Sequence, residues 1–180
     1  MLGNTHTRYG LAARLLHWSL AALMLFLIWL GWWKVELSCY DAWYYASRQW
    51  HEALGILGWL LGLVFAVGHM LNRPPPSLPL HGCERWASAV AHKLLYVALL
   101  ALPAAGYVIA TADGNALELF GLVALPPLFG ASEAARDVAT AIHTYGAYGL
   151  LGLVCIHASG ELKHHVLDRD RTLMRMIRGQ

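Results

Sequence analysis

Residues 138–160 read VATAIHTYGAYGLLGLVCIHASG and contain no Asp, Glu, Lys or Arg. At about 1.5 Å per residue, a helix of this length can cross the hydrocarbon core of a bilayer, which is about 30 Å thick. Two imidazole side chains, His143 and His157, lie within this apolar segment. Ionisable groups are costly inside a membrane and usually serve a site. The segment therefore predicts a membrane-spanning helix whose two histidines have a function.

Three further segments of similar length also lack charged residues, namely 15–33, 53–72 and 94–112. The chain has 180 residues, of which 58% are hydrophobic and 13% are charged. This composition is too apolar for an ordinary soluble domain. We therefore predict an all-α integral membrane protein, in which residues 1–180 form a single four-transmembrane-helix domain. The predicted spans are approximately 14–33, 51–71, 90–111 and 139–161.

The connecting segments contain residues that interrupt helices. The motif RPPPSLP at 73–79 should end the second span, because proline cannot continue a helix. The segment 113–137 contains an apolar run that Pro126 and Pro127 interrupt, and this run is too short to cross a membrane. Two interpretations of it stay open. It is either a plain connecting loop, which is the more common case, or a lid that lies on the membrane surface over the outer site.

The distribution of Lys and Arg predicts the orientation. Flanks on the side of the two termini hold all of the 13 Lys and Arg residues except Lys34, Arg48 and Arg136. Short cytoplasmic flanks are enriched in Lys and Arg, so we predict that both termini are cytoplasmic. The formal net charge of +2 reflects this topology and forms no basic stripe of the kind that binds nucleic acid.

Four histidines in the predicted spans fall into two layers. His17 and His157 lie toward the inner ends of their spans, and His51 and His143 lie toward the outer ends. Fourteen helical residues turn through about 1,400°, which is close to four full turns, so His143 and His157 share one face. Their α-carbons are about 21 Å apart, too far for one ion to touch both. The pattern predicts two stacked sites, each completed by a histidine from another helix.

The available ligands favour haem over zinc at these sites. Zinc takes four N, S or O ligands, and Glu52 is the one carboxylate or thiol that lies beside the imidazoles. Porphyrin iron already has four nitrogen ligands and needs two axial ones. A flat ring also needs small residues beside its ligand, and we predict ring contacts at Gly55, Gly146 and Gly160, each about one turn from a candidate histidine. Helix packing is the alternative role for each glycine.

Geometry alone leaves the inner pair undecided. His69 follows His51 by 18 positions, or five turns, and so lies on the same stripe at the inner layer. His92 lies at the inner start of the third span. The inner site could therefore use any two of four residues, which are His17, His69, His92 and His157.

Several motifs together resemble the bacterial cytochrome b561 family over nearly the whole chain. They are LHW at 16–18, HEALGIL at 51–57, AHKLLYVALLALPAAGYVIATADG at 91–114 and HASGELKHHVLDRDRTLMRM at 157–176. RYG at 8–10 and LSCYDAWY at 37–44 further resemble the branch of the cytochrome b561 homolog proteins. The resemblance implies a four-helix bundle in the inner (cytoplasmic) membrane of bacteria, with two b-type haems.

The resemblance also implies which histidines bind iron. The family's axial ligands match His17 with His157 at the inner haem and His51 with His143 at the outer haem, which leaves His69 a structural or inner-surface role. Haem propionates are anions that prefer nearby cations. We predict propionate contacts for Arg48 at the outer site and for Lys163 and His164 at the inner site. For Lys163, an anchor at the cytoplasmic membrane surface is the alternative.

Iron with two histidine ligands has no free position, which favours electron transfer over oxygen binding. The resemblance implies ubiquinone as the substrate. The first functional hypothesis is a di-haem b-type cytochrome that transfers electrons between the ubiquinone pool and a periplasmic donor or acceptor. No catalytic side chain is predicted beyond the haem-binding residues.

Two alternatives remain. The family also contains superoxide oxidases, which pass electrons from superoxide to ubiquinone. Such an enzyme should attract an anion to its outer face, whereas the predicted outer loops are mainly acidic, with Asp41, Asp113, Glu118, Glu133 and Asp137. A local cationic approach at Lys34 and Arg48 would still serve superoxide. The other alternative is a haem transport protein without redox turnover.

Overall fold

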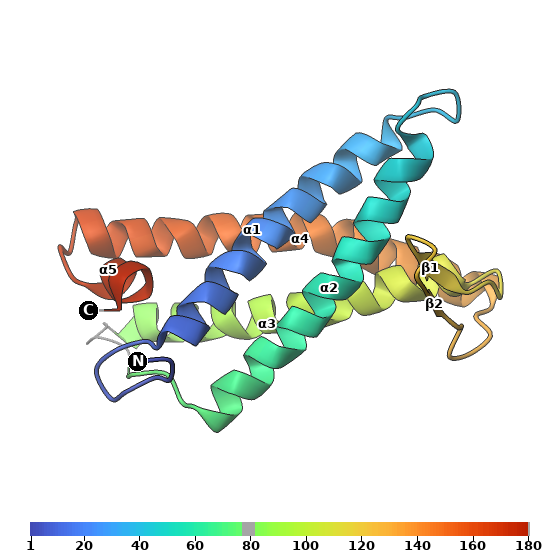
Figure 1. The fold of residues 1–180 in the computed structure, drawn as a ribbon. Helices are drawn as coiled ribbons and strands as arrows, with labels where there is room; N and C mark the ends of the chain where they lie inside the picture. Colours follow the sequence, from blue (N-terminus) through green and yellow to red (C-terminus); the bar gives the residue numbers. More distant parts are fainter. Residues whose placement is uncertain (77–81, 180) are drawn as a thin grey trace.

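The computed structural model describes residues 1–76 and 82–179, and it is mainly helical (Figure 1). The long helices are α1 (Leu11–Val35), α2 (Tyr44–Leu71), α3 (Gly82–Thr111) and α4 (Glu133–Val166), and a short helix α5 (Thr172–Arg178) follows. All four long helices have the length and composition needed to cross a membrane. The prediction of an all-α, four-helix membrane protein is confirmed. Each predicted span lies within one helix, and each helix extends beyond its span.

Local sequence explains where α2 ends and where α4 begins. α2 ends at Leu71, shortly before Pro74, while residues 77–79 of the proline motif lie outside the described part of the chain. α4 begins after Ser132, whose hydroxyl oxygen accepts a hydrogen bond of 3.2 Å from the backbone N–H of Ala135. This N-cap satisfies one of the donors that the first turn leaves unpaired. Both signals are local, so both were readable from the sequence.

The long helices pack as two crossed pairs. α1 lies against α2, α3 lies against α4, and α2 joins the pairs by packing on α3 (Figure 1). Glycines permit two of these approaches. An added Cβ would come within 2.6 Å of Met24 Cε at Gly58 and within 2.9 Å of Leu99 Cγ at Gly62. α1 and α4 contact each other over only a short stretch. Most of the surface that each helix turns toward the other is therefore not used for packing between them.

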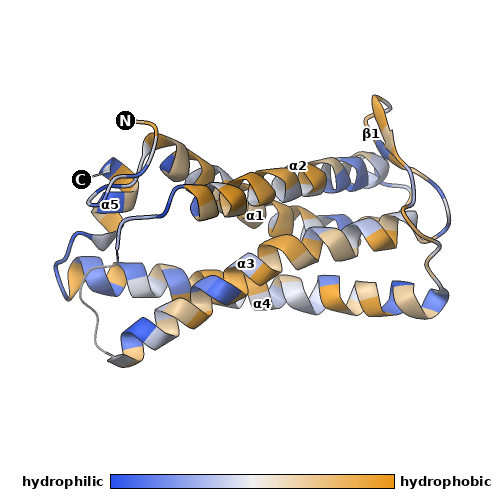
Figure 2. Cartoon of the chain, turned by 90° about the horizontal axis from the view of Figure 1, so that it is seen from below, coloured by the Kyte–Doolittle hydropathy of each residue, from blue (hydrophilic) through white to orange (hydrophobic). Residues whose placement is uncertain are grey.

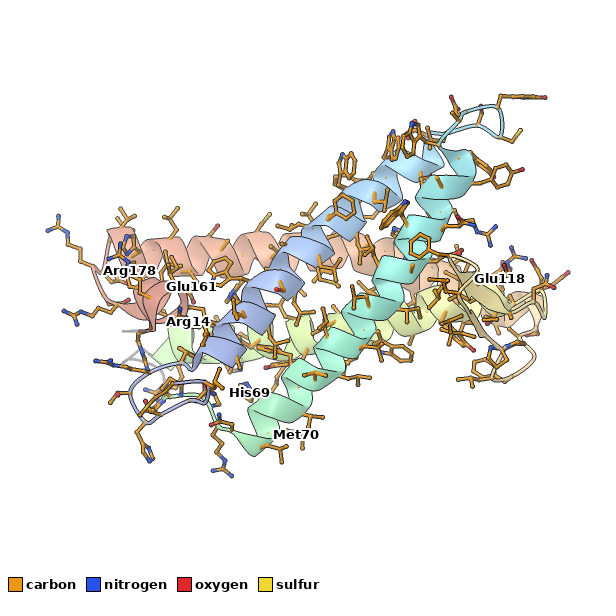
Figure 3. All side chains as sticks on the ribbon, in the orientation of Figure 1. Arg14, His69, Met70, Glu118, Glu161 and Arg178 are labelled. Atoms are coloured by element: carbon orange, nitrogen blue, oxygen red, sulfur yellow. The ribbon has the colours of Figure 1, made fainter. Side chains whose placement is uncertain are left out.

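The two ends of the bundle differ. Both termini and α5 lie at one end, here called the terminal end, and a β-hairpin lies at the other, here called the hairpin end (Figures 1 and 2). Apolar residues dominate the helices between these ends, and polar residues gather toward them (Figure 2). Figure 3 shows Arg14, Glu161 and Arg178 at the terminal end and Glu118 at the hairpin end. This distribution is the one expected for a bundle that crosses a membrane.

The hairpin corrects the sequence-based description of residues 113–137, in which no strand was predicted. β1 (Leu117–Leu119) pairs antiparallel with β2 (Val123–Leu125). The turn between them uses positive φ angles at Phe120 (52°) and Gly121 (68°). Strands of three residues are too short for an alternating pattern to be recognised in the sequence.

The hairpin segment packs onto the bundle. The rings of Phe120 and Trp50, on α2, have centroids 4.8 Å apart. The hydroxyl of Tyr107, on α3, donates a hydrogen bond to the carbonyl oxygen of Pro126. Leu117 is buried. The segment therefore covers the ends of α2 and α3.

Candidate functional site

Four histidines form two pairs inside the bundle, and within each pair the two rings face each other. α4 contributes one member of each pair. At the hairpin end, the ring centroids of His143 and His51, on α2, are 6.0 Å apart. At the terminal end, those of His157 and His17, on α1, are 6.3 Å apart. All four residues are half-buried. The structure thus brings together the two pairs that the resemblance to the family implied.

Both spacings suit a shared metal ion. An imidazole nitrogen binds a first-row metal at about 2 Å, so two rings on opposite sides of one ion have centres roughly 6 Å apart. Within each pair the ring planes are steeply inclined, by 71° at the hairpin end and 66° at the terminal end. Such rings cannot stack on each other, whereas two axial ligands can take this mutual angle. The donor sets therefore fit two bis-imidazole haem sites.

The second ring nitrogen of His143 is held by α3. His143 Nδ1 lies 2.9 Å from the carbonyl oxygen of Leu102. A carbonyl only accepts hydrogen bonds, so a neutral His143 carries its proton on Nδ1 and keeps the lone pair of Nε2 for a metal. Gly106 makes this approach possible, because an added Cβ there would lie 3.0 Å from His143 Cε1. A hydrogen bond of this kind is the usual support of a metal-binding histidine.

His51 has a different environment. Its Nδ1 is buried and has no hydrogen-bond partner, one of three such side-chain atoms among the described residues. Gly31, on α1, backs the ring, since an added Cβ would lie 3.2 Å from His51 Cε1. Buried polar atoms without partners are rare in folded proteins. An unpaired imidazole nitrogen is consistent with a site that a cofactor completes.

The sequence did not identify the two glycines that contact the histidines. Gly31 and Gly106 lie on helices opposite the ligands, whereas the predicted glycines lie on the same helix as their ligands. Of the three predicted glycines, Gly55 and Gly160 would place a Cβ in open space, and Gly146 would place one 2.5 Å from Leu102 Cδ2. Gly146 thus fits the helix-packing alternative. Ring contacts at Gly55 and Gly160 stay predictions.

A third imidazole lies at the terminal end. The ring centroids of His92 and His157 are 5.1 Å apart, which is shorter than two rings that flank one metal require. His92 Nδ1 is also 2.7 Å from the carbonyl oxygen of Ser88. His69 is exposed, and its Nδ1 lies 3.0 Å from the hydroxyl of Tyr96. The spacing therefore favours His17 as the partner of His157.

The three predicted propionate contacts already pair with carboxylates of the protein. Arg48 Nε lies 2.8 Å from Glu52 Oε1. Lys163 Nζ lies 2.8 Å from Glu84 and 2.7 Å from Asp168. His164 contacts two aspartates beyond the end of α4. A propionate contact at any of these cations would have to share or replace the existing partner, and these roles stay predictions.

A small pocket opens between α1 and α2 at the hairpin end. Its volume is about 310 Å³, and its lining residues are Lys34, Val35, Leu37, Tyr44 and Arg48. Two of the three Lys and Arg residues predicted for the outer side thus line one pocket. These are the two residues of the local cationic approach that the sequence left open, and that role stays a prediction.

Comparisons with known proteins identify the family of this chain. The family model described as prokaryotic cytochrome b561 matches residues 8–179. The chain is 38% identical over 176 residues to cytochrome b561 homolog 2 of Escherichia coli (strain K12), covering 97% of this chain and 93% of that protein. It is 27% identical to a probable superoxide oxidase, CybB, of Yersinia pestis, covering 96% and 97% of the two chains. Cytochrome b561 homolog 1 of Escherichia coli is also 27% identical, over 74% of this chain and 76% of that protein. The chain therefore belongs to the prokaryotic cytochrome b561 family, whose members are membrane electron-transfer proteins that bind b-type haem.

Proposed function

We propose that the protein is a di-haem b-type cytochrome that transfers electrons across the bacterial inner membrane, between the ubiquinone pool and a periplasmic donor or acceptor. The facing histidine pairs at 6.0 and 6.3 Å, near opposite ends of α4, are the observation that carries this proposal. Their positions on α4 are about 21 Å apart, so a single iron cannot use both pairs. Each pair would hold one haem.

The protein's own residues define what the sites can do. When bound, haem supplies one-electron oxidation and reduction at its iron. Each pair of imidazoles would supply the two nitrogen ligands that a porphyrin iron still needs, so oxygen could not bind the iron without loss of a ligand. At the hairpin end, the Leu102 carbonyl holds the proton of His143 on Nδ1 and so leaves the lone pair of Nε2 free to bind a metal. The sites are therefore suited to electron transfer.

The proposed orientation follows from the flanking charges. The terminal end holds most of the Lys and Arg residues and would face the cytoplasm. The pair of His17 and His157 would then lie near the cytoplasmic side, and the pair of His51 and His143 near the periplasmic side. Electrons that pass between the two haems would cross most of the hydrocarbon core.

Superoxide oxidation is the second candidate, and the pocket beside Lys34 and Arg48 is the observation that favours it. Superoxide is an anion, and a cationic pocket raises its local concentration. The acidic residues at the hairpin end repel superoxide less than their number suggests. One of them, Asp113, forms an ion pair of 2.9 Å with Arg136. The charge of Arg48 is itself offset by Glu52.

Rapid-mixing reduction of the purified protein distinguishes these functions. Ubiquinol and superoxide would be tested separately, and the absorbance of the two low-spin haems would be followed. We expect reduction by ubiquinol. If only superoxide reduces the haems at a rate near the diffusion limit, the protein is a superoxide oxidase. Loss of haem during purification, or haem that neither donor reduces, would contradict both and support haem transport.

A matched pair of variants sharpens the same measurement. Lys34→Gln removes a charge from the pocket and should slow reduction by superoxide while leaving reduction by ubiquinol unchanged. Lys93→Gln, an exposed change toward the terminal end of α3, should affect neither rate. Equal effects of both variants would mean that the pocket does not guide superoxide.

A further inference from the structure

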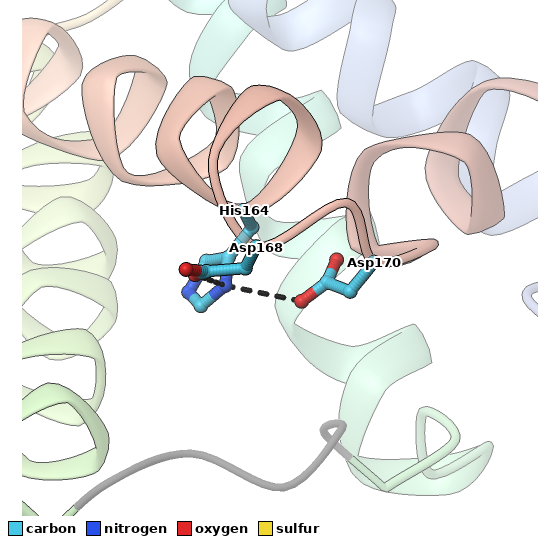
Figure 4. Close-up of side chains that lie close together, drawn as sticks. All are labelled: His164, Asp168 and Asp170. Atoms are coloured by element: carbon cyan, nitrogen blue, oxygen red, sulfur yellow. Dashed lines mark ion pairs between the residues drawn. The ribbon is translucent and has the colours of Figure 1, made fainter.

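Three metal-binding side chains converge just beyond the end of α4, apart from the two histidine pairs. His164 lies in the last turn of α4, and the chain then folds back so that Asp168 and Asp170 face it (Figure 4). His164 Nδ1 lies 2.9 Å from Asp168 Oδ2 and 3.1 Å from Asp170 Oδ2. The ligand atoms of all three residues lie within 4.8 Å of one another.

The backbone builds this convergence. The N–H of Asp168 donates to the carbonyl oxygen of Lys163 (3.2 Å), and the N–H of Asp170 donates to that of His164 (3.0 Å). The other carboxylate oxygen of Asp170, Oδ1, accepts a hydrogen bond of 2.8 Å from the N–H of Thr172 at the start of α5. Asp170 thus uses one oxygen to hold the backbone and presents the other to His164.

The imidazole nitrogen at the centre of the cluster has ionic contacts but no hydrogen bond. His164 Nδ1 is buried and lies within ion-pair distance of two carboxylate oxygens, yet it forms a hydrogen bond with neither. Two ligands of one metal, each about 2 Å from it in a tetrahedral arrangement, are roughly 3.3 Å apart. The two N···O distances, 2.9 and 3.1 Å, are close to this value. A small movement of the carboxylate groups would therefore let all three atoms bind one ion.

We propose that His164, Asp168 and Asp170 form a binding site for a divalent cation of the Zn²⁺ class, with water completing the coordination. One nitrogen and two carboxylate oxygens match the ligand chemistry of zinc. Two carboxylates and a neutral imidazole also balance the charge of the ion. The ion fastens the segment 168–179, which includes α5, to the end of α4. In this proposal His164 serves the ion in place of the predicted propionate contact.

Lys163 is the competing cation at this site. Its Nζ lies 2.7 Å from Asp168 Oδ2, and the hydrogen bond from Lys163 keeps the pKa of Asp168 below its ordinary value. Lys163 also contacts Glu84 at 2.8 Å, so it keeps a partner when Asp168 binds the ion. Its charge weakens the site, and we expect micromolar binding rather than the tighter binding of four-ligand structural zinc sites.

Calorimetric titration of the haem-loaded, chelator-treated protein with Zn²⁺ tests the proposal. We expect about one Zn²⁺ per chain, and we expect His164→Ala and Asp168→Asn each to weaken binding by roughly 100-fold, at least as much as loss of an outer-shell partner. His165→Ala is the matched control, because this neighbouring histidine is exposed and outside the cluster. Zn²⁺ should also slow tryptic cleavage after Arg169 and Arg171 in the unchanged protein.

The outcomes separate this proposal from the haem function. If His164→Ala does not fold, Asp168→Asn carries the test, and far-UV circular dichroism reports helical folding in every sample. The site is disproved if Zn²⁺ does not bind, if both variants bind it as well as the unchanged protein, or if His165→Ala alone removes binding. Binding of Mg²⁺ or Ca²⁺ but not Zn²⁺ would overturn the assigned class of ion. Failure of the electron-transfer proposal would leave these results unaffected.

Discussion

The two ends of α4 support their histidine pairs in different ways. At the hairpin end, backbone positions the rings: the Leu102 carbonyl binds His143 Nδ1, and Gly106 and Gly31 bring helix backbone against His143 and His51. Each of these contacts restricts where a ring can lie. A pair held in this way is specified before any cofactor binds.

At the terminal end, other rings lie beside the pair. The ring of His92 lies beside that of His157, and the ring of Phe65 has its centroid 6.4 Å from that of His17. A third imidazole therefore lies beside the pair, at a spacing from His157 that is too short for the two rings to flank one metal. The comparison shows that equal ring spacing can be reached with different degrees of preorganisation.

Removal of one ligand from each pair should have the largest effect. His143→Ala should lose only the haem at the hairpin end, and His157→Ala only the haem at the terminal end, because each ring completes one pair. The haem content, measured by the pyridine haemochrome assay, should fall from about two to about one per chain. His69→Ala is the control and should keep both haems. Loss of both haems in either ligand variant would mean that the two sites are not independent.

Disturbing the backbone support should have the next largest effect, and only at the hairpin end. In Gly106→Ala, the new methyl group would lie 3.0 Å from His143 Cε1 and force the ring away from Leu102. Such overpacking costs about 1–3 kcal/mol. Absorption spectra and redox titration should show a perturbed haem at the hairpin end and an unchanged haem at the terminal end. Gly152→Ala, where a Cβ would meet nothing within 4 Å, is the matched control. Equal spectra for the two variants would show that Gly106 does not position His143.

The third imidazole should tune the terminal site without holding its haem. We expect His92→Ala to keep both haems and to shift the midpoint potential of the terminal-end haem, because the polar ring beside His157 is removed. Potentiometric titration measures the potential, and the pyridine haemochrome assay measures the haem content. If His92→Ala loses a haem and His17→Ala does not, the proposed inner pair is wrong.

A small effect is expected where neither pair is involved. The N–H and hydroxyl of Ser38 donate hydrogen bonds of 2.7 and 2.9 Å to Asp41 Oδ2 in the α1–α2 loop, and these bonds lower the pKa of Asp41 below its ordinary value of 3.8. Because the pKa is lowered by folding, the contact contributes fully above about pH 4 and is lost as the pH falls through the lowered value.

Asp41→Asn should therefore increase hydrogen exchange in the α1–α2 loop at neutral pH, after correction for intrinsic rates. The haem spectrum and both potentials should not change. This variant serves as the control for the other variants at the hairpin end. A shift in either potential would show that the loop and the site are coupled.

Local sequence was enough to predict the spans and the layers of histidines. Charge-free segments identify membrane helices because a bilayer cannot solvate charges. Helical periodicity then places His143 and His157 on one face at different depths. The hairpin was missed because its register depends on a turn and on contacts with α2 and α3, and neither leaves a periodic signal in three-residue strands.

The choice among inner histidines needed more than periodicity. His17, His69, His92 and His157 all fall in one layer, and helix geometry along a single chain segment does not determine which of them face each other. The structure adds the ring distances and shows that His69 is bound to Tyr96. The glycines beside the ligands were missed for the same reason, since Gly31 and Gly106 act on rings that belong to other helices.

The sequence by itself determined the membrane class, the four helices, the family and the depth of each candidate ligand. All of these depend on local hydropathy, helical repeat or short motifs, which are properties of neighbouring residues. Only the tertiary structure decided which imidazoles face each other, which backbone groups support them, and that His164, Asp168 and Asp170 converge. Those features depend on how helices pack and how the chain turns back on itself, and such contacts join residues whose separation along the chain carries no periodic signal.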